Sequence, residues 1–347
     1  MYGKKIKYYR MKNGLTVEQL AAKLSCTKAA VSQYENDKRD PDDDTLKSIS
    51  KIFGINVINL FYRQNIQCDF NHCSFRKKMK TSQNEIEILK ADIESKCIDQ
   101  ISVMDLLGIV PAKPFTAKNL SINDDIEDNA KEIRNALEIS SNGPVYSITN
   151  ILERLGIIVL TFDCPEDIEG LNGTANKIPY IFFNSSKNVE RQRFTLMHEF
   201  CHLFFNHLED TKDLEKYINK LAGHVLISDT DIFHEFGKVN RNLNKYLLNS
   251  VAREYKIAPS CLITRLFEAK VITEMYYRNF FKFLNARIGR SNEETLLVGL
   301  EETELPTAFN QLVFRALDEE LISKSRAAEL LSRPLFDIIK ETEVIKL

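Results

Sequence analysis

The residues of this chain whose types and spacing could do chemistry lie in one stretch, where His198 and His202 stand four positions apart. Residues four apart on a helix share one face, so both imidazoles can bind a single metal ion. Glu199 follows the first histidine and can take a proton from a water molecule beside that ion. The pattern predicts a zinc site with a general base; the alternative is a pair of buried core histidines.

A catalytic zinc site needs a third protein ligand and one open position for water. In the apolar helix expected over residues 214–227, Glu215 lies on the inner face, so its carboxylate could reach the two histidines. His207 follows too closely after the motif unless the helix bends back. The downstream candidates for the third ligand are His207, Glu209, Asp210, Asp213, Glu215 and His224.

The elements that must position this motif can be read from the preceding residues. Apolar residues at helical spacing predict helices over 126–137 and 144–155. The β-branched run 157–162 predicts a buried strand, and residues 180–184 predict another. Between the two strands, residues 170–174 are rich in turn-forming types and are expected to form a turn.

Charge is distributed unevenly along the chain. Residues 1–80 hold 16 Lys and Arg against 8 Asp and Glu, whereas the remaining residues hold 31 against 41. A basic head on an acidic body favours a nucleic-acid partner for the head.

Residues 1–62 predict a bundle of short helices. Thr16 can cap one helix together with Gln19, and Thr27 can cap the next. Gly54 is expected to end the last long helix. Two short helices joined by a tight turn form a helix-turn-helix, in which the second helix enters the major groove of DNA.

This head resembles the Cro/repressor-type (XRE) helix-turn-helix family over residues 14–21, 30–35 and 38–41. The resemblance implies that residues 27–35 are the recognition helix and that residues 1–62 bind double-stranded DNA. The alternative is a scaffold used only for protein contacts. The residues expected to contact bases or phosphates are Thr27, Lys28 and Gln33, with Lys38 and Arg39 on phosphates.

Residues 63–125 are expected to connect the head to the remaining chain. Cys68, His72 and Cys73 lack a second ligand pair at zinc-site spacing, so a surface loop is the simpler interpretation. Within the connector, the spacing of Ile86, Leu89, Ile93 and Cys97 indicates an amphipathic helix, for packing or for a homodimer.

Residues 284–347 predict an acidic helical region that could sense a signal or mediate dimerisation.

Residues 126–283 resemble the ImmA/IrrE family of metallopeptidases through the histidine motif, residues 193–196 before it and residues 215–227 after it. The resemblance implies a zincin-like α+β fold, a zinc cofactor and a ligand role for Glu215. It also implies a protein substrate, typically a repressor with its own helix-turn-helix. A second helix-turn-helix, expected over residues 247–273, would belong to this fold.

Composition excludes several classes of protein. A hydrophobic share of 44% and a charged share of 28% are those of a globular chain. No apolar run approaches the about 20 residues that span a bilayer, and Met1 leads into a charged segment, unlike a signal peptide. Seven scattered cysteines are typical of a reducing compartment. We therefore expect no membrane partner and a cytoplasmic location.

These observations predict a mostly α chain with a small β-sheet (α+β): an all-α helix-turn-helix domain, an α+β metallopeptidase domain and a helical C-terminal region. The expected function is a DNA-binding transcriptional regulator with a zinc-dependent endopeptidase that cleaves a repressor in a stress, mobile-element or prophage circuit. Glu199 would move the proton, and Tyr217 or His224 could help to polarise the substrate carbonyl. The alternative is a non-proteolytic transcription factor or antitoxin that uses the peptidase fold as a sensor or docking body. In a third interpretation, the head holds the protease near its own promoter.

Overall fold

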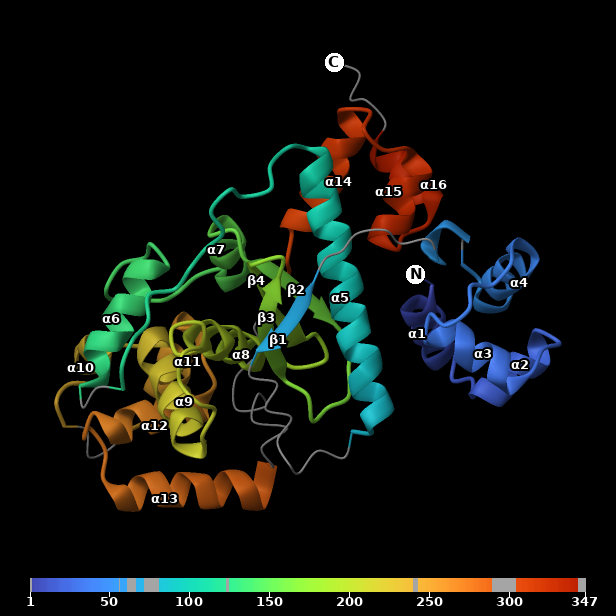
Figure 1. Cartoon of the computed structure of the whole chain (residues 1–347). Helices are drawn as coiled ribbons and strands as arrows, with labels where there is room; N and C mark the ends of the chain where they lie inside the picture. The colour runs from blue at the N-terminus through green and yellow to red at the C-terminus, as the bar shows by residue number, and fades with distance from the viewer. Residues whose placement is uncertain are drawn as a thin grey trace. The chain divides into compact units, whose positions relative to one another are not determined.

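The computed structural model divides into two compact units, residues 1–67 with 80–98 and residues 68–79 with 99–347 (Figure 1). None of the helices in the described ranges is long and apolar enough to cross a bilayer. The residues that the structure describes are 2–55, 57–60, 67–71, 81–122, 125–239, 243–288 and 304–342.

The first unit begins with the predicted helical bundle. Thr16 and Gln19 form a reciprocal capping box, and the side chain of Thr27 accepts the N–H of Ala30, as expected. Gly54 ends the last long helix with a φ of 65°. The elements are α1 (Gly3–Lys12), α2 (Val17–Lys23), α3 (Lys28–Glu35), α4 (Asp43–Phe53) and the 3₁₀ helix η1 (Val57–Leu60).

The start of α1 packs closely against the end of α3. A Cβ on Gly3 would lie 2.5 Å from the carbonyl oxygen of Glu35, so only glycine fits there. Asp37, just beyond α3, accepts the N–H groups of Tyr2 and Gly3 through Oδ1 and so caps α1. The fully buried core of this bundle includes Ile6, Leu20, Val31 and Ile49.

Helix α5 (Gln83–Leu106) is the predicted amphipathic helix of the connector. Its residues 83–98 belong to the first unit, where Asp92 contacts the hydroxyl of Tyr8 and the ammonium of Lys12. The residues at helical spacing that predicted it, Ile86, Leu89, Ile93 and Cys97, are all buried.

The second unit contains one mixed sheet of four strands in the order β1-β3-β4-β2. Strand β4 pairs parallel with β2 and antiparallel with β3, and β1 pairs antiparallel with β3. The strands are β1 (Cys68–Asn71), β2 (Ile158–Phe162), β3 (Gly170–Ala175) and β4 (Ile178–Asn184).

Two predictions about this sheet are wrong. Residues 170–174 form strand β3, and the turn follows at Asn176 and Lys177, whose φ angles are 48° and 68°. The glycines of β3 serve close packing, since a Cβ on Gly170 would lie 2.4 Å from Cγ2 of Thr195. The connector was expected to form a loop at Cys68, which lies instead in edge strand β1; His72 and Cys73 fall outside the described residues.

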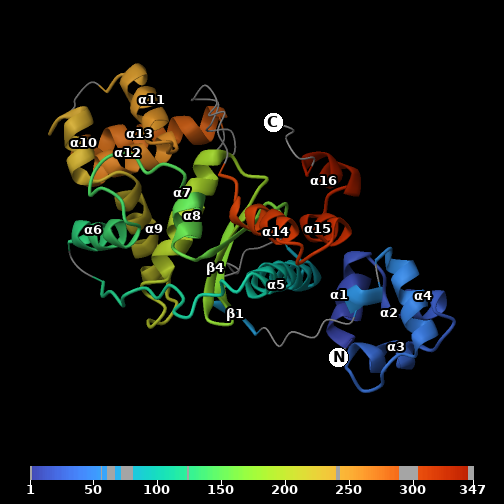
Figure 2. The same ribbon diagram turned by 90° about the horizontal axis from the view of Figure 1, so that it is seen from above.

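Helices α8 and α9 pack on each other, and α8 also lies against β3 and β4 (Figure 2). The predicted helix-turn-helix near residues 247–273 is present as α11 and α12, which share the main core. The helices of this part are α6 (Ile126–Ala136), α7 (Ile148–Arg154), α8 (Val189–His202), α9 (Lys212–Leu226), α10 (Asp229–Phe236), α11 (Lys245–Glu254), α12 (Pro259–Glu268) and α13 (Glu274–Phe283), followed by the π turn η2 (Leu284–Ile288).

The C-terminal region is helical, as predicted. Val103 of α5, in the part (residues 99–106) that belongs to the second unit, packs into the core of this helical bundle. The helices are α14 (Ala308–Asp318), α15 (Lys324–Leu331) and α16 (Leu335–Glu341).

Two reciprocal helix caps attach this region to α7. Ser147 begins α7 without a side-chain cap, and Glu304 instead accepts the N–H groups of Ile148 and Thr149. At the other end of α7, Glu153 accepts the N–H groups of residues 307 and 308 at the start of α14. The expected boundary at residue 284 therefore separates two segments that these caps hold together.

Glu304 also forms a buried ion pair with Arg193 of α8. The exposed fractions of the two side chains are 5% and 1%. Arg193 donates in addition to the carbonyl oxygens of Val145 and Lys256, so each of its three guanidinium nitrogens has an acceptor.

We predict that Glu304→Ala lowers the free energy of unfolding of the second unit by about 3–5 kcal/mol, because it leaves the Arg193 charge buried without its carboxylate. Urea unfolding followed by circular dichroism would measure the loss. Glu319→Ala is the matched control, since Glu319 pairs with Arg315 at an exposed position of α14 and its loss should have little effect. Equal effects of the two substitutions would contradict the role of Glu304.

Candidate functional site

Helix α8 carries the candidate chemistry at its C-terminal end. Asn188 caps its first turn by accepting the N–H of Arg191, and the helix ends at His202. Its apolar residues include Cys201, which is fully buried, and burial raises the pKa of that thiol. Cys201 is therefore a core residue.

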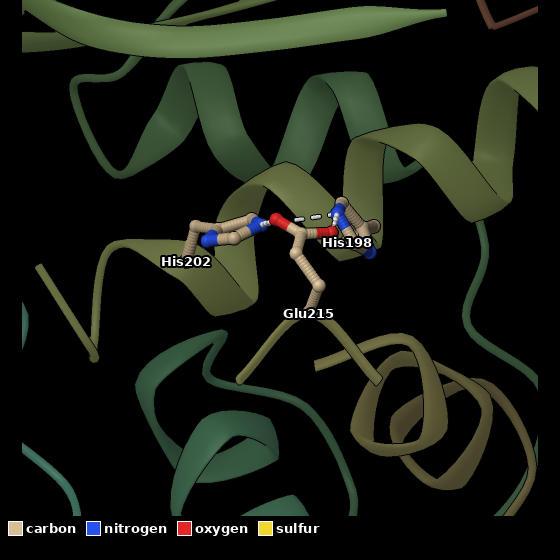
Figure 3. Close-up of side chains that lie close together, drawn as sticks. All are labelled: His198, His202 and Glu215. Carbon is tan, nitrogen blue, oxygen red and sulfur yellow. Dashed lines mark hydrogen bonds and ion pairs between the residues drawn. The ribbon is translucent and has the colours of Figure 1, made fainter. Parts of the chain in front are cut away.

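The third candidate ligand comes from α9, which begins at the capping residue Thr211 and packs beside α8. Oε1 of Glu215 lies 3.0 Å from Nε2 of His202, and its Oε2 lies 3.6 Å from Nε2 of His198 (Figure 3). The two Nε2 atoms lie 3.0 Å apart. The structure thus brings together all three predicted ligands.

This donor set fits a zinc ion. Two imidazole nitrogens and one carboxylate oxygen are common zinc ligands, with bond lengths of about 2.0–2.2 Å. Tetrahedral ligands at that distance lie about 3.3 Å from one another. The two Nε2 atoms lie 3.0 Å apart, and each lies 3.0 or 3.6 Å from a different oxygen of Glu215, so all three groups lie within reach of one ion.

The charge state of His202 depends on the same carboxylate. Burial, the largest single influence, lowers the pKa of His202. The hydrogen bond that Glu215 accepts and the negative charges of Glu199, Glu215 and Asp210 together outweigh burial, so the net shift is upward. Because only neutral imidazole binds a metal, protons and a metal ion would compete for this site.

Glu199 stands beside the ligands without being one of the three. It is buried, and its Oε2 accepts a hydrogen bond of 2.8 Å from Nδ2 of Asn172 on β3. Burial raises the pKa of Glu199 to about 7, while the nearby His202 and the Asn172 bond act in the opposite direction. The sequence did not predict this role of Asn172, because the segment that contains it has the composition of a turn.

The other residues proposed near the metal lie elsewhere. His224, nine residues after Glu215 on α9, is about 13 Å further along the helix axis. Its Nδ1 contacts Glu127, and its Nε2 lies 2.6 Å from Nη1 of Arg265. The expectation that His224 polarises a substrate carbonyl is therefore wrong. The alternative ligands His207, Glu209, Asp210 and Asp213 are exposed.

Arg265 lies at the centre of this second cluster of charged groups and pairs with its carboxylates. Its guanidinium group lies 2.6 Å from Asp229 and 2.9 Å from Glu268, and its exposed fraction is 1%. Nε2 of His224 also lies 3.3 Å from Oε2 of Glu268. The cluster is therefore a network of paired charged groups that joins α6, α9, α10 and α12.

Tyr217 was the other residue expected to polarise the carbonyl. Its hydroxyl lies 2.7 Å from Nδ2 of Asn129 on α6, and its ring packs edge-on against Phe205. Its role in catalysis stays a prediction.

The expected DNA-contacting residues lie at or near α3. Thr27 uses its hydroxyl to cap α3, and Lys28 forms an ion pair with Glu18 of α2. The guanidinium of Arg39 lies 5.9 Å from the centre of the Tyr34 ring. All five predicted residues, Thr27, Lys28, Gln33, Lys38 and Arg39, are exposed.

Comparisons with known proteins match the two parts separately. A family model described as "Helix-turn-helix" matches residues 6–58, and one described as "IrrE N-terminal-like domain" matches residues 152–267. The chain belongs to the helix-turn-helix family and joins an XRE-type domain to an ImmA/IrrE-like domain. It thus combines a helix-turn-helix domain with a second, ImmA/IrrE-like domain.

Two curated relatives match the head. The HTH-type transcriptional regulator ImmR of Bacillus subtilis is 40% identical over 55 residues, 16% of this chain and 43% of ImmR. The uncharacterized HTH-type transcriptional regulator MJ0272 of Methanocaldococcus jannaschii is 37% identical over 57 residues, 16% of this chain and 86% of that protein. The chain therefore spans less than half the length of ImmR.

A solved structure, Bacillus thuringiensis PlcR in complex with the peptide PapR7 and DNA, aligns over 98% of this chain and 95% of its own. Its TM-score of 0.19 and identity of 15% are too low to support an argument about the fold.

We predict that His202→Ala and Glu215→Ala each weaken zinc binding by more than about 100-fold, since losing even a residue that supports a ligand costs about 10–100-fold. Competition with a chromogenic chelator would measure the affinity of each full-length variant. His207→Ala is the matched control, because His207 is exposed, and it should bind zinc as the wild type does. Full zinc affinity in Glu215→Ala would show that this residue is not a ligand.

A separate prediction concerns the DNA interface. Gln33→Ala should reduce discrimination among duplexes, because it removes a side chain able to pair with a base edge. Lys38→Ala should weaken binding to all duplexes and reduce the slope of log affinity against log salt by about 1. Selection from a random duplex pool by the full chain, followed by binding titrations at several salt concentrations, would separate the two effects. Equal loss of discrimination in both variants would contradict the assignment.

Proposed function

We propose that this chain is a DNA-binding transcriptional regulator and also a zinc-dependent endopeptidase that cleaves another protein. One observation carries the proposal: three ligand groups from α8 and α9 converge, and Glu199 beside them is held by Asn172. A purely structural zinc site uses four protein ligands, whereas a catalytic one uses three and keeps a position open. The separate buried carboxylate favours the catalytic arrangement.

In this proposal His198, His202 and Glu215 hold the zinc ion. The ion, when bound, supplies the Lewis acidity that polarises the peptide carbonyl and acidifies water. Glu199 accepts the proton of the attacking water and passes it to the nitrogen of the leaving amine. Asn172 holds Glu199 through a hydrogen bond to its Oε2, which fixes the orientation of this carboxylate.

The substrate that we propose is a repressor with its own helix-turn-helix, cut in a stress, mobile-element or prophage circuit. Support comes from the helix-turn-helix family match of the head and from its similarity to the HTH-type transcriptional regulator ImmR. Double-stranded DNA is the proposed partner of residues 1–62, and the cytoplasm is the proposed location.

We predict that Glu199→Gln keeps zinc but loses cleavage, because the amide can still accept the hydrogen bond from Asn172 but takes up no proton. Cells that express the wild type or Glu199→Gln would be compared by mass spectrometry of protein N-termini. New N-termini should appear only with the wild type, and they would identify the substrate. His207→Ala should produce the same new N-termini as the wild type. If Glu199→Gln also produces them, the chain is not acting as this peptidase, and the sensor or docking alternative gains support.

A further inference from the structure

The two edges of the sheet differ in their relation to the catalytic groups. Strand β2 forms one edge, and β1, paired with β3, forms the other. Asn172 of β3 holds Glu199, and a Cβ on Gly170 of β3 would lie 3.4 Å from Cγ of Glu199. The β3 side of the sheet is therefore the one that lies against the candidate base.

Strand β1 covers the outer side of β3 at this position. It runs antiparallel to β3, with Cys68 opposite Ala175 and Asn71 opposite Asn172. It comes from the connector that follows the DNA-binding head and precedes α5 (Figure 1). A segment outside the matched peptidase domain thus pairs with the strand that holds the base.

The fit between β1 and β3 is made mainly by backbone. A Cβ on Gly173 would lie 2.1 Å from the carbonyl oxygen of Asp69, so a side chain there would push β1 away. The hydroxyl of Tyr180 donates to the same carbonyl at 3.3 Å. Phe70 adds an edge-on contact with the Tyr180 ring, at 6.1 Å between centroids.

A pairing of this kind is available to other extended peptides. When a peptide adds to a sheet edge, main-chain hydrogen bonds supply affinity, and pockets for alternate side chains supply specificity. The β1 strand has only four residues, and the side chain of Asp69 is exposed. The side chain that it places against Tyr180 is the aromatic ring of Phe70.

We propose that the outer edge of β3 is the docking edge for an extended peptide, and that β1 is its resident competitor. The partner is a polypeptide segment that pairs antiparallel to β3 and places an apolar or aromatic side chain against Tyr180. It binds only when β1 withdraws. The consequence for cleavage rests on the proposed endopeptidase function.

The pairing of β1 with β3 allows a reversible disulfide to be introduced between the two strands. Cys68 lies opposite Ala175, and directly opposed residues of antiparallel strands have Cα separations of about 4.5–5.5 Å, within the range that a disulfide spans. Ala175→Cys should therefore allow oxidation to tie β1 to β3, and dithiothreitol should release it. Cys68→Ser combined with Ala175→Cys is the control that cannot form this bond.

A second variant opens the edge. Phe70→Asp replaces the contact with Tyr180 by a charge and should release β1. Asp69→Asn is its control, because that side chain is exposed and should leave β1 in place.

The binding test uses full-length proteins that carry Glu199→Gln, so that no peptide is consumed. The probe is a fluorescent synthetic peptide, Gln-Ser-Asp-Phe-Asn, which copies residues 67–71 with serine in place of Cys68. Fluorescence anisotropy should show at least tenfold tighter binding to Phe70→Asp than to the parent or to Asp69→Asn. Oxidised Ala175→Cys should bind at least tenfold more weakly than its reduced form. If the disulfide does not form, the comparison of Phe70→Asp with Asp69→Asn decides alone.

Equal binding by Phe70→Asp and Asp69→Asn, or no binding by any variant, would overturn the proposal. A parallel assay with intact Glu199 would count new N-termini in a lysate treated with the Ala175→Cys variant, once in its oxidised and once in its reduced form. If the peptide binds as expected but no variant cleaves, the docking edge stands and the endopeptidase function fails. If the oxidised Ala175→Cys variant cleaves as well as its reduced form, the endopeptidase stands and the competitor role of β1 fails.

Discussion

Helix α8 must carry charged and polar side chains into an apolar core, and the rest of the second unit depends on how each of them is paired. A buried charge or hydrogen-bonding group without a partner costs several kcal/mol. Arg193 pairs with Glu304, Glu199 with Asn172, and His202 with Glu215. The partners come from the C-terminal segment, from β3 and from α9. The same pairings that stabilise the buried polar side chains of α8 therefore assemble the candidate active site.

The position of α9 follows from a second set of buried cations. Arg134 of α6 donates to the carbonyl oxygen of Val225 in the last turn of α9. Arg265 of α12 donates to the carbonyl oxygen of Ile227 and lies beside His224. These bonds hold the C-terminal end of α9, while Glu215 lies near its N-terminal end. The carboxylate thus reaches the histidines from a helix that is fixed at its far end.

The sequence could predict what rests on local spacing. The caps of the head, the four-residue spacing of the histidines and the helical face of Glu215 are all local features, and the structure contains them. Asn172 could not be predicted, because Gly170 and Gly173 on either side of it give the segment the composition of a turn, whereas the structure uses them for close packing. Glu304 lies 111 residues after Arg193, and no local pattern connects an acidic residue to a partner so distant.

The helix-turn-helix head and the ImmA/IrrE-like domain have different roles. The head belongs to a family of transcriptional regulators, and the ImmA/IrrE-like domain contains the residues that can hold a metal. The structural distinction between a regulator that cuts and one that only senses comes down to the coordination of that metal. Three protein ligands leave room for water, whereas a fourth protein ligand would close the site.

The most direct test of the account is therefore zinc K-edge X-ray absorption of the zinc-loaded, full-length wild type, together with its metal stoichiometry. The account predicts one zinc ion per chain, bound by two imidazole nitrogens, one carboxylate oxygen and one further oxygen from water. Sulfur in the coordination sphere, four protein ligands or no stoichiometric zinc would contradict it.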